Sequence, residues 1–503
     1  MTATPPSRQP HALDPDLRKL ALVIVAGTIM TILDSTIVNV ALTPLGREFR
    51  ASLPTIQWVL TGYGLALAMV IPVSGWVVER FGARTTWIAS LLVFTAGSVL
   101  CGAAWNVAAL IVFRVIQGIG GGMVIPVGQM MAARKAGPGR MARMLSVVAI
   151  PSMIGPLLGP VAGGLIIENL SWRWMFFVNV PLCAVAVLLA VRLLPRDAGH
   201  APDRRIDAVG LALLPPGVAF GVYGLSRASA DNTQAVIWTA AGAACVVAFG
   251  LRARRIDFPL ISVRAFTRPA FAACSAAMFV YLAALYGFMV VLPVYFQVVR
   301  VQTPLGAGLL LAPLTLGAGL SMAVSGRLAH RIPARWTIVA GITVVAAGAI
   351  WFSRLGPGAS LALVAGTLFV TSLGHGAILP AGMGAAYQDM PKAEIPAATA
   401  TFNVVFRVAS SFGTAMLAVV AQQSIRSRVP GVASLADAAR PHGPAAGAAL
   451  AGAFGVSFWW VAVLAAAAVI PALFIPGRGA ASMTSLLSPG ERRDESRNVS
   501  TPR

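Results

Sequence analysis

Charged side chains are scarce in this sequence. Only 11% of its 503 residues are Asp, Glu, Lys or Arg, whereas a soluble domain carries about 25%. The chain is 57% hydrophobic, so it could not cover its own surface with polar groups in water. The scarcity argues against a soluble enzyme and against a disordered protein. It predicts an all-α polytopic membrane protein.

Several kinds of chemical site are also missing. The four cysteines lie in apolar stretches without a short paired spacing, which argues against a zinc site and a disulfide framework. No GxxxxGK[ST] loop is present, so ATP bound by this chain is not expected to supply energy. The sequence shows no cluster of His, Glu and Asp that would indicate catalysis. We therefore expect no enzymatic activity, no metal and no cofactor.

Basic residues outnumber acidic ones by 38 to 17, which gives a formal net charge of +21. A nucleic-acid partner would require this charge on one face or arm, but it lies in small groups between apolar runs. The loops and tails on one side of the expected membrane topology hold about three times as many basic residues as the loops on the other side. Segments rich in Lys and Arg remain on the cytoplasmic side of a membrane. We expect no nucleic-acid partner, a multi-pass protein of the inner (plasma) membrane, and both termini in the cytoplasm.

Fourteen apolar runs are long enough to cross a bilayer, which takes about 20 residues per helix. The runs are 19–43, 55–76, 85–105, 108–131, 143–166, 174–194, 206–226, 234–253, 270–297, 305–327, 336–353, 359–384, 396–424 and 452–475. We expect an N-terminal six-span unit over 19–194, two linking spans within 206–253, and a C-terminal six-span unit over 270–475. Residues 1–18 and 476–503 are expected to be cytoplasmic tails.

One carboxylate, Asp34, lies deep in a predicted span, and no other acid does. An Asp near the centre of a spanning helix costs about 2.5–3.5 kcal/mol of insertion free energy, so it should face a polar cavity or a partner. Without a nearby cation, such a group favours its neutral form, which suits the uptake and release of protons. The alternative is a structural Asp held by hydrogen bonds from Asn39 or from a neighbouring helix.

The fourth span places a cation in the same outer half of the membrane. Arg114 lies about six residues, or roughly 9 Å, from the outer surface, and Gln117 follows it by one turn. Its guanidinium could hold a polar network or relay charge during proton movement, or it could simply extend outward to the interface. Asp34 and Arg114 are therefore the candidates for proton coupling.

Two glycine-containing motifs suggest conformational roles. The loop after the second span carries glycines that permit a tight turn and charges that reach a helix end or headgroups: Gly75, Glu79, Arg80, Gly82 and Arg84. The fifth span combines a four-residue glycine repeat, which gives a smooth packing face, with two prolines that favour a kink: Gly155, Pro156, Gly159, Pro160, Gly163 and Gly164. An ordinary basic loop and an ordinary packing face are the alternatives.

In this order the motifs resemble those of the major facilitator superfamily, specifically its fourteen-span branch of drug/proton antiporters. The resemblance lies in the first-span, loop, fourth-span and fifth-span motifs and in the entry to the sixth span: 34–42, 75–84, 114–118, 155–164 and 171–181. It implies the major facilitator fold, with two six-helix bundles joined by two extra helices. The sequence departs from the loop motif at Glu79, where Asp is usual, and at His330 in the second half, where an acid is expected.

The resemblance also implies proton-coupled efflux of lipophilic or cationic drug-like compounds by alternating access, driven by the proton motive force. Export of one metabolite, such as a siderophore or a self-made antibiotic, is the alternative. The expected partners are a small-molecule substrate, protons and the lipid bilayer, and the chain is expected to be a monomer. The candidate substrate-binding residues, some of which are expected only to pack helices together, are Asn39, Gln57, Tyr63, Gln117, His375, Asn403 and Arg407.

Overall fold

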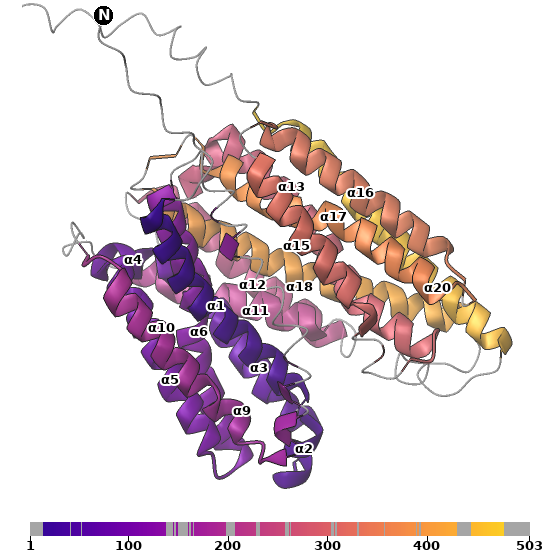
Figure 1. Cartoon of the computed structure of the whole chain (residues 1–503), viewed down its shortest axis with the longest axis horizontal. Coiled ribbons are helices and arrows are strands. Elements are labelled where there is room, and N and C mark those ends of the chain that lie inside the picture. Colours follow the sequence, from indigo (N-terminus) through magenta and orange to yellow (C-terminus); the bar gives the residue numbers. More distant parts are fainter. Residues whose placement is uncertain are drawn as a thin grey trace, which may run out of the picture.

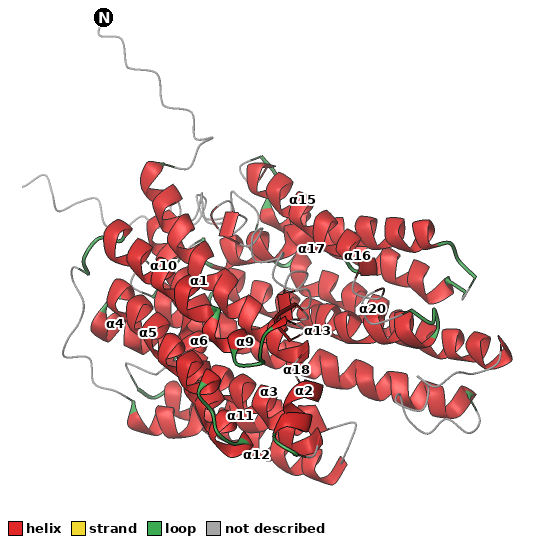
Figure 2. Ribbon diagram, turned by 60° about the horizontal axis from the view of Figure 1, so that its bottom comes forward, coloured by secondary structure: helices red, strands yellow, loops and turns green. Residues whose placement is uncertain are grey.

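The structure of the chain is a computed structural model. Its regular secondary structure is helical, and the described residues include no strand (Figure 2). It describes residues 14–476 except for positions 41, 52, 137–143, 145–146, 149–158, 160–161, 164, 168, 198–206, 228–231, 257–260, 262, 303–305, 307–308, 329–330, 357, 389, 392–393 and 430–443. The all-α fold expected from the apolar runs is confirmed for this part of the chain.

The first group of helices packs as one bundle, coloured indigo to magenta in Figure 1. It contains α1 (Pro15–Val40), α2 (Leu42–Glu48), α3 (Leu53–Val70), η1 (Ile71–Val73), α4 (Ser74–Phe81), α5 (Ala83–Gly102), α6 (Val107–Ala136), α9 (Trp174–Phe177) and α10 (Asn179–Leu193). Helices α3, η1 and α4 follow one another directly, so 58–81 forms one apolar run. That run ends at Gly82, where a positive φ of 88° suits glycine and turns the chain into α5.

The last group of helices forms a second bundle, coloured salmon to yellow in Figure 1. It contains η2 (Val263–Thr267), α13 (Pro269–Val298), α15 (Ala312–Leu328), α16 (Ala334–Arg354), α17 (Leu361–Ala386), α18 (Ile395–Arg428) and α20 (Pro444–Leu473). In its core, the rings of Phe288, Phe352 and Phe458 lie with centroids 5.5 to 5.8 Å apart. These edge-to-face and tilted contacts fix α13, α16 and α20 against one another.

Two linking helices, α11 (Ala208–Arg227) and α12 (Asn232–Ala253), form an antiparallel hairpin. Its ends are tied together because Asp207 accepts a hydrogen bond from the backbone of Gly210 at 2.8 Å and pairs with Arg252 at 3.2 Å. Helix α11 contacts α3 of the first bundle and α18 of the second. On the α3 side, Trp58 stacks on Tyr223 with ring centroids 5.8 Å apart. The hairpin therefore touches both bundles where they meet.

The two bundles also touch each other directly through α18, which packs against α4, η1 and α6. Small residues allow this approach on the α4 side. A Cβ at Gly75 would lie 3.2 Å from the carbonyl oxygen of Pro396 and 3.4 Å from Ala400. The predicted turn glycine Gly75 thus lies directly against the opposite bundle.

Twelve helices in the described part of the chain are long and apolar enough to cross a membrane. They fall on twelve of the fourteen predicted spans. Of the other two, 305–327 overlaps α15, which has only 17 residues, and 143–166 lies mostly outside the described residues. The structure therefore confirms a polytopic helical membrane protein, and the count of fourteen stays a prediction.

Candidate functional site

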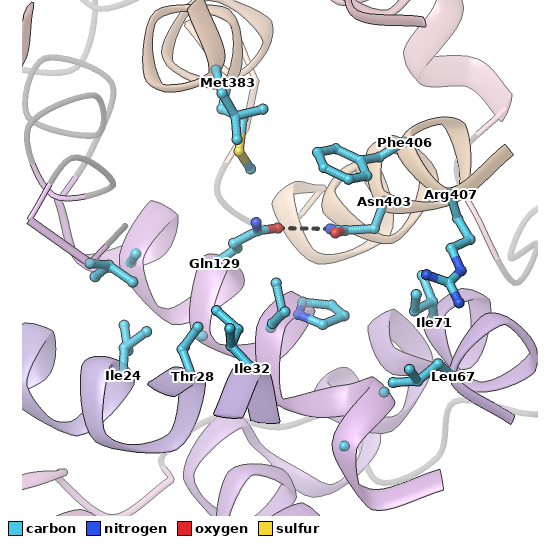
Figure 3. Close-up of a pocket in the computed structure, with 18 of the residues that line it drawn as sticks. Ile24, Thr28, Ile32, Leu67, Ile71, Gln129, Met383, Asn403, Phe406 and Arg407 are labelled. Carbon is cyan, nitrogen blue, oxygen red and sulfur yellow. Dashed lines mark hydrogen bonds between the residues drawn. The ribbon is translucent and has the colours of Figure 1, made fainter. Parts of the chain in front are cut away.

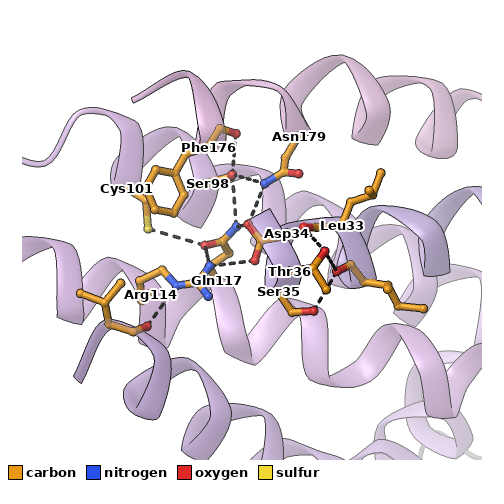
Figure 4. A network of polar contacts seen from close by, with 12 residues as sticks. Leu33, Asp34, Ser35, Thr36, Ser98, Cys101, Arg114, Gln117, Phe176 and Asn179 are labelled. Atoms are coloured by element: carbon orange, nitrogen blue, oxygen red, sulfur yellow. Dashed lines mark hydrogen bonds and ion pairs between the residues drawn. The ribbon is translucent and has the colours of Figure 1, made fainter. Parts of the chain in front are cut away.

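Asp34 and Arg114 form an ion pair in the centre of the first bundle (Figure 4). Arg114 Nη1 lies 2.7 Å from Asp34 Oδ2, and neither side chain exposes any surface. The two residues are 80 positions apart and are brought together by α1 and α6. Asp34 has the partner that its depth in the span requires. The alternative in which Arg114 extends outward to the membrane interface is wrong, because its guanidinium is fully buried and pairs with the carboxylate of Asp34.

Most of the other polar atoms of the pair are also hydrogen-bonded, the exception being Arg114 Nη2, which is buried without a partner among the described residues. Gln117 Nε2 and Asn179 Nδ2 each donate to Asp34 Oδ1 at 2.8 Å. Arg114 donates from Nη1 to Gln117 Oε1 at 2.7 Å and from Nε to the carbonyl of Val59 at 3.2 Å. A buried ion pair is tolerated only when such further hydrogen bonds compensate for lost water. The structure therefore holds Asp34 in a complete shell of donors rather than in a wet cavity.

Ser98 on α5 closes this network. Its hydroxyl accepts from Gln117 at 3.2 Å and Asn179 at 3.0 Å, and it donates to the carbonyl of Phe176 at 2.8 Å. The network requires α5 and α6 to lie very close, because a Cβ at Gly97 would sit 2.6 Å from Gln117 Cα. Neither Ser98 nor Asn179 is among the candidates from the sequence. Asn179 lies in the sixth-span entry motif 171–181, whereas polarity within an apolar helix is the only sequence signal for Ser98.

Tyr63 belongs to the same network rather than to a substrate site. Its ring lies beneath the Arg114 guanidinium, 4.0 Å from ring centroid to Cζ, which is a close cation–π contact. Tyr63 is buried, and it does not line the cavity described next. The same is true of Gln117. We therefore place these two predicted substrate-binding residues in the network around Asp34.

A cavity of about 380 Å³ lies between the two bundles (Figure 3). Most of its lining is aliphatic or aromatic, with contributions from α1, α3, η1 and α6 on one side and from α13, α15, α17 and α18 on the other. The lining residues with polar side chains are Thr28, Gln129, Tyr286, Asn403 and Arg407. Two predicted substrate-binding residues, Asn403 and Arg407, thus lie at this cavity. An apolar pocket with a few polar groups is typical of small-molecule sites.

Two of these polar groups bond across the cavity to the opposite bundle. Asn403 Nδ2 donates to Gln129 Oε1 at 2.8 Å, as Figure 3 shows, and Arg407 Nη2 donates to the carbonyl of Gly64 at 3.0 Å. Gln129 is not among the candidate substrate-binding residues from the sequence, where a polar residue in an apolar run is most often a helix-packing partner. Any movement of one bundle against the other must break or exchange these two bonds.

His375 on α17 lies away from both sites. It is buried, its Nδ1 is 2.6 Å from the hydroxyl of Tyr281, and it is not among the cavity-lining residues. The side chains of Asn39 and Gln57 lie outside the described part of the structure, so their predicted roles are left as predictions. The described members of the predicted substrate-binding set therefore lie in three places: the network around Asp34, the cavity between the bundles, and the contact with Tyr281.

The loop motif is anchored by an acid that sequence reasoning missed. Asp197 accepts from the backbone nitrogens of Arg84 at 3.0 Å and Thr85 at 2.8 Å, at the start of α5. Glu79 was the acid expected at the N-terminus of a nearby helix. At the N-terminus of α5, however, the carboxylate is that of Asp197, which follows α10. Arg84 also donates to the carbonyl of Val191 at 2.8 Å, whereas Arg80 is partly buried in the last turn of α4. A carboxylate at a helix N-terminus satisfies free N–H groups and stabilises the helix.

The fifth-span motif is described only in part. A Cβ at Gly159 would overlap the side chain of Thr36, so this position approaches α1 as closely as a packing face requires. Gly163 is helical and buried. The other four motif residues lie outside the described residues: Gly155, Pro156, Pro160 and Gly164. Within the described part of the chain, no group of three or more His, Cys, Asp or Glu side chains could hold a metal.

Comparison with known proteins agrees with this architecture. The chain matches the Major Facilitator Superfamily over residues 24–414. It is 35% identical to a multidrug resistance protein B homolog of Mycobacterium tuberculosis, over 93% of this chain and 91% of that one. It is 30% identical to the multidrug export protein EmrB of Haemophilus influenzae, over 79% of each chain.

Two solved structures share the fold. The human organic anion transporter MFSD10 superimposes with a TM-score of 0.66 at 15% identity, covering 92% of this chain and all of that one. The proton:xylose symporter XylE superimposes with a TM-score of 0.63 at 14% identity, covering 92% of this chain and 96% of that one. At these identities the two structures establish a common arrangement of helices and nothing about cargo.

Proposed function

Because this chain belongs to the major facilitator superfamily, we propose that it exports lipophilic drug-like compounds in exchange for protons. Its relatives are transporters rather than enzymes, and several carry the words multidrug resistance or multidrug export in their names. The chain is a membrane-embedded transporter of small molecules. We further propose fourteen spans, both termini in the cytoplasm of a plasma-membrane protein, and a monomer that needs no cofactor.

The cavity between the bundles supports transport by alternating access. It draws its lining from both bundles, so a bound compound would contact both. The two hydrogen bonds that cross the cavity join α18 to α6 and to α3. A neutral bond of this kind contributes about 1 kcal/mol and one with a charged donor about 1.5–3 kcal/mol, so the two bonds bias one conformation without locking it. Rocking of the bundles would expose the cavity to alternate sides.

The buried carboxylate supports proton coupling, and it is the observation that carries this part of the proposal. Asp34 is the only acid deep within a predicted span, and its charge is balanced by Arg114. Protonation of Asp34 would remove its negative charge and break the ion pair. The guanidinium of Arg114 would then need other hydrogen-bond partners. Because Asp34 does not line the cavity, we propose that proton and cargo compete through conformation rather than for one atom.

Helix α3 offers a physical connection between the two sites. Its Val59 carbonyl accepts from Arg114, and the ring of Tyr63 lies beneath the same guanidinium. The carbonyl of the next residue, Gly64, accepts from Arg407 at the cavity. A shift of Arg114 on protonation of its partner would therefore act on the backbone segment that Arg407 holds. We propose α3 as the element whose position both sites bias.

Reconstitution with a pH gradient tests the proposal. Proteoliposomes containing an internal pH-sensitive dye are challenged with a panel of lipophilic antibiotics and dyes. We expect substrate-dependent proton flux for the wild type and none for Asp34→Asn, whereas Asp16→Asn, at an exposed acid of α1, should behave as wild type. Substrate movement without proton flux would reject antiport. Movement of a single metabolite and of no other compound would favour the dedicated exporter.

A further inference from the structure

The central cavity has one ionised side chain in its lining, among the residues that the structure describes. That side chain is Arg407 on α18. The other polar groups of the lining are neutral: one hydroxyl, one phenol and two amides. The cavity lining therefore has a positive electrostatic character on an otherwise apolar surface.

Among the described residues that line the cavity, none carries a carboxylate that could balance this charge. Asp34 is the only acid deep in a predicted span, and it is already bound by Arg114, Gln117 and Asn179 away from the cavity. The stretch 137–167, much of which lies outside the described residues, has no Asp or Glu in its sequence. A cationic cargo would thus meet Arg407 and find no anionic partner.

Arg407 itself lacks a counterion in the described part of the structure. Its Nη2 donates to the carbonyl of Gly64 at 3.0 Å, and its buried Nε has no hydrogen-bond partner. A guanidinium has five N–H donors in a planar fork. Removing such a cation from water without an anion is costly, unless an anion arrives with the ligand. Figure 3 shows the guanidinium beside Ile71 and Leu67, which are apolar neighbours on the wall of the cavity.

We infer that the cargo is a lipophilic anion, whose acidic group binds to the guanidinium of Arg407. Two parallel N–H···O bonds to a carboxylate or sulfonate suit the guanidinium fork. The apolar body of the cargo would lie against the wall formed by Phe406, Met383 and Ile32. This inference rests on the proposed export function and narrows its cargo from lipophilic compounds in general to lipophilic anions.

Three pyrene probes of different charge test the inference in proteoliposomes: pyrenesulfonate, the neutral pyrenesulfonamide and pyrenyl-trimethylammonium. Both charged probes are permanently charged, so the pH gradient does not change their form. The variants are Arg407→Gln, which removes the charge, and Arg407→Lys, which keeps it. Arg426→Gln, at an exposed arginine on the same helix, is the matched control.

The wild type should export pyrenesulfonate at least about tenfold faster than the ammonium probe, since a lost charge pair in a dry site costs at least that factor. Arg407→Gln should lower the ratio of sulfonate export to sulfonamide export about tenfold or more, since only the sulfonate loses a charge partner. Arg407→Lys should keep part of the preference for the sulfonate, and Arg426→Gln should keep all of it.

Two results would overturn the inference. One is a wild type that exports the ammonium probe as fast as the sulfonate. The other is an equal loss for all probes in Arg407→Gln, because this would make Arg407 a purely structural contact to Gly64. Either result, if proton flux accompanies export, would reject the anionic cargo and leave the proposed function intact. Failure of the wild type to move any probe or any compound of the antibiotic panel would reject both.

Discussion

Replacing Asp34 by Asn should destabilise the first bundle as well as uncouple transport. The substitution keeps the size of the side chain but removes its charge, so Arg114 becomes a buried cation without a counterion. The new amide group must also face a donor, since both oxygens of Asp34 accept hydrogen bonds. Breaking a buried ion pair by removing one partner costs about 3–5 kcal/mol, and we expect a loss of folding free energy in this range.

The double variant Asp34→Asn/Arg114→Gln separates stability from coupling. It removes both charges together and leaves neutral amides, and replacing a whole buried pair by neutral groups is often close to neutral in free energy. We therefore expect the double variant to be more stable than either single one, with a coupling free energy of roughly 2–3 kcal/mol. Unfolding in mixed micelles with increasing sodium dodecyl sulfate measures this cycle. The same proteins in proteoliposomes report proton-driven export.

The reasoning gives distinct outcomes for the two roles of Asp34. If Asp34 carries the proton, the double variant regains stability but shows no export driven by a pH gradient. Additive losses in the double variant, or an Asp34→Asn protein as stable as wild type, would refute the ion pair as a stabilising contact. Full proton-driven export by the double variant would refute the coupling role while leaving the stability argument in place.

Three further predictions follow from the contacts around these sites. Asp197→Ala removes the carboxylate at the start of α5 and should cost about 1 kcal/mol in the same unfolding assay, whereas the exposed ion-pairing Asp16→Ala should cost little. Asn403→Ala removes a hydrogen bond between the bundles worth about 1 kcal/mol, so the ratio of the two conformations should shift about fivefold in electron-spin distance measurements between α6 and α18. Gly97→Leu should separate α5 from α6 and lower the yield of folded protein by size-exclusion chromatography, while Gly366→Leu, where no atom lies within 4 Å, should not.

The sequence indicated the local features of the transporter well. Apolar runs near the length of a bilayer predicted the helices, because the cost of placing polar groups in lipid depends on composition along each segment. The depth of Asp34 and Arg114 in their spans follows from the same reasoning, as does the need of a buried acid for a partner. The motif around Gly159 also predicted a close helix contact that the structure contains, whereas Gly75, which was predicted in a turn, lies within α4.

The tertiary structure decided which of these polar groups meet. Arg114 binds one oxygen of Asp34 across 80 residues, and Asn179 donates to the other oxygen from 145 residues away, because α6 and α10 both pack near α1. No periodicity in the sequence encodes such a meeting, which depends on the rotation and spacing of whole helices.

By itself, the sequence determined that the chain lies in a membrane, how its apolar segments are spaced, and that Asp34 is its one deep carboxylate. Only the packing of the two bundles decided that this carboxylate is enclosed by its own bundle, while Arg407 lines the cavity between the bundles. The physical reason is that the free energy of insertion into lipid depends on the composition of each segment separately, whereas a polar site is formed by side chains from several helices at once.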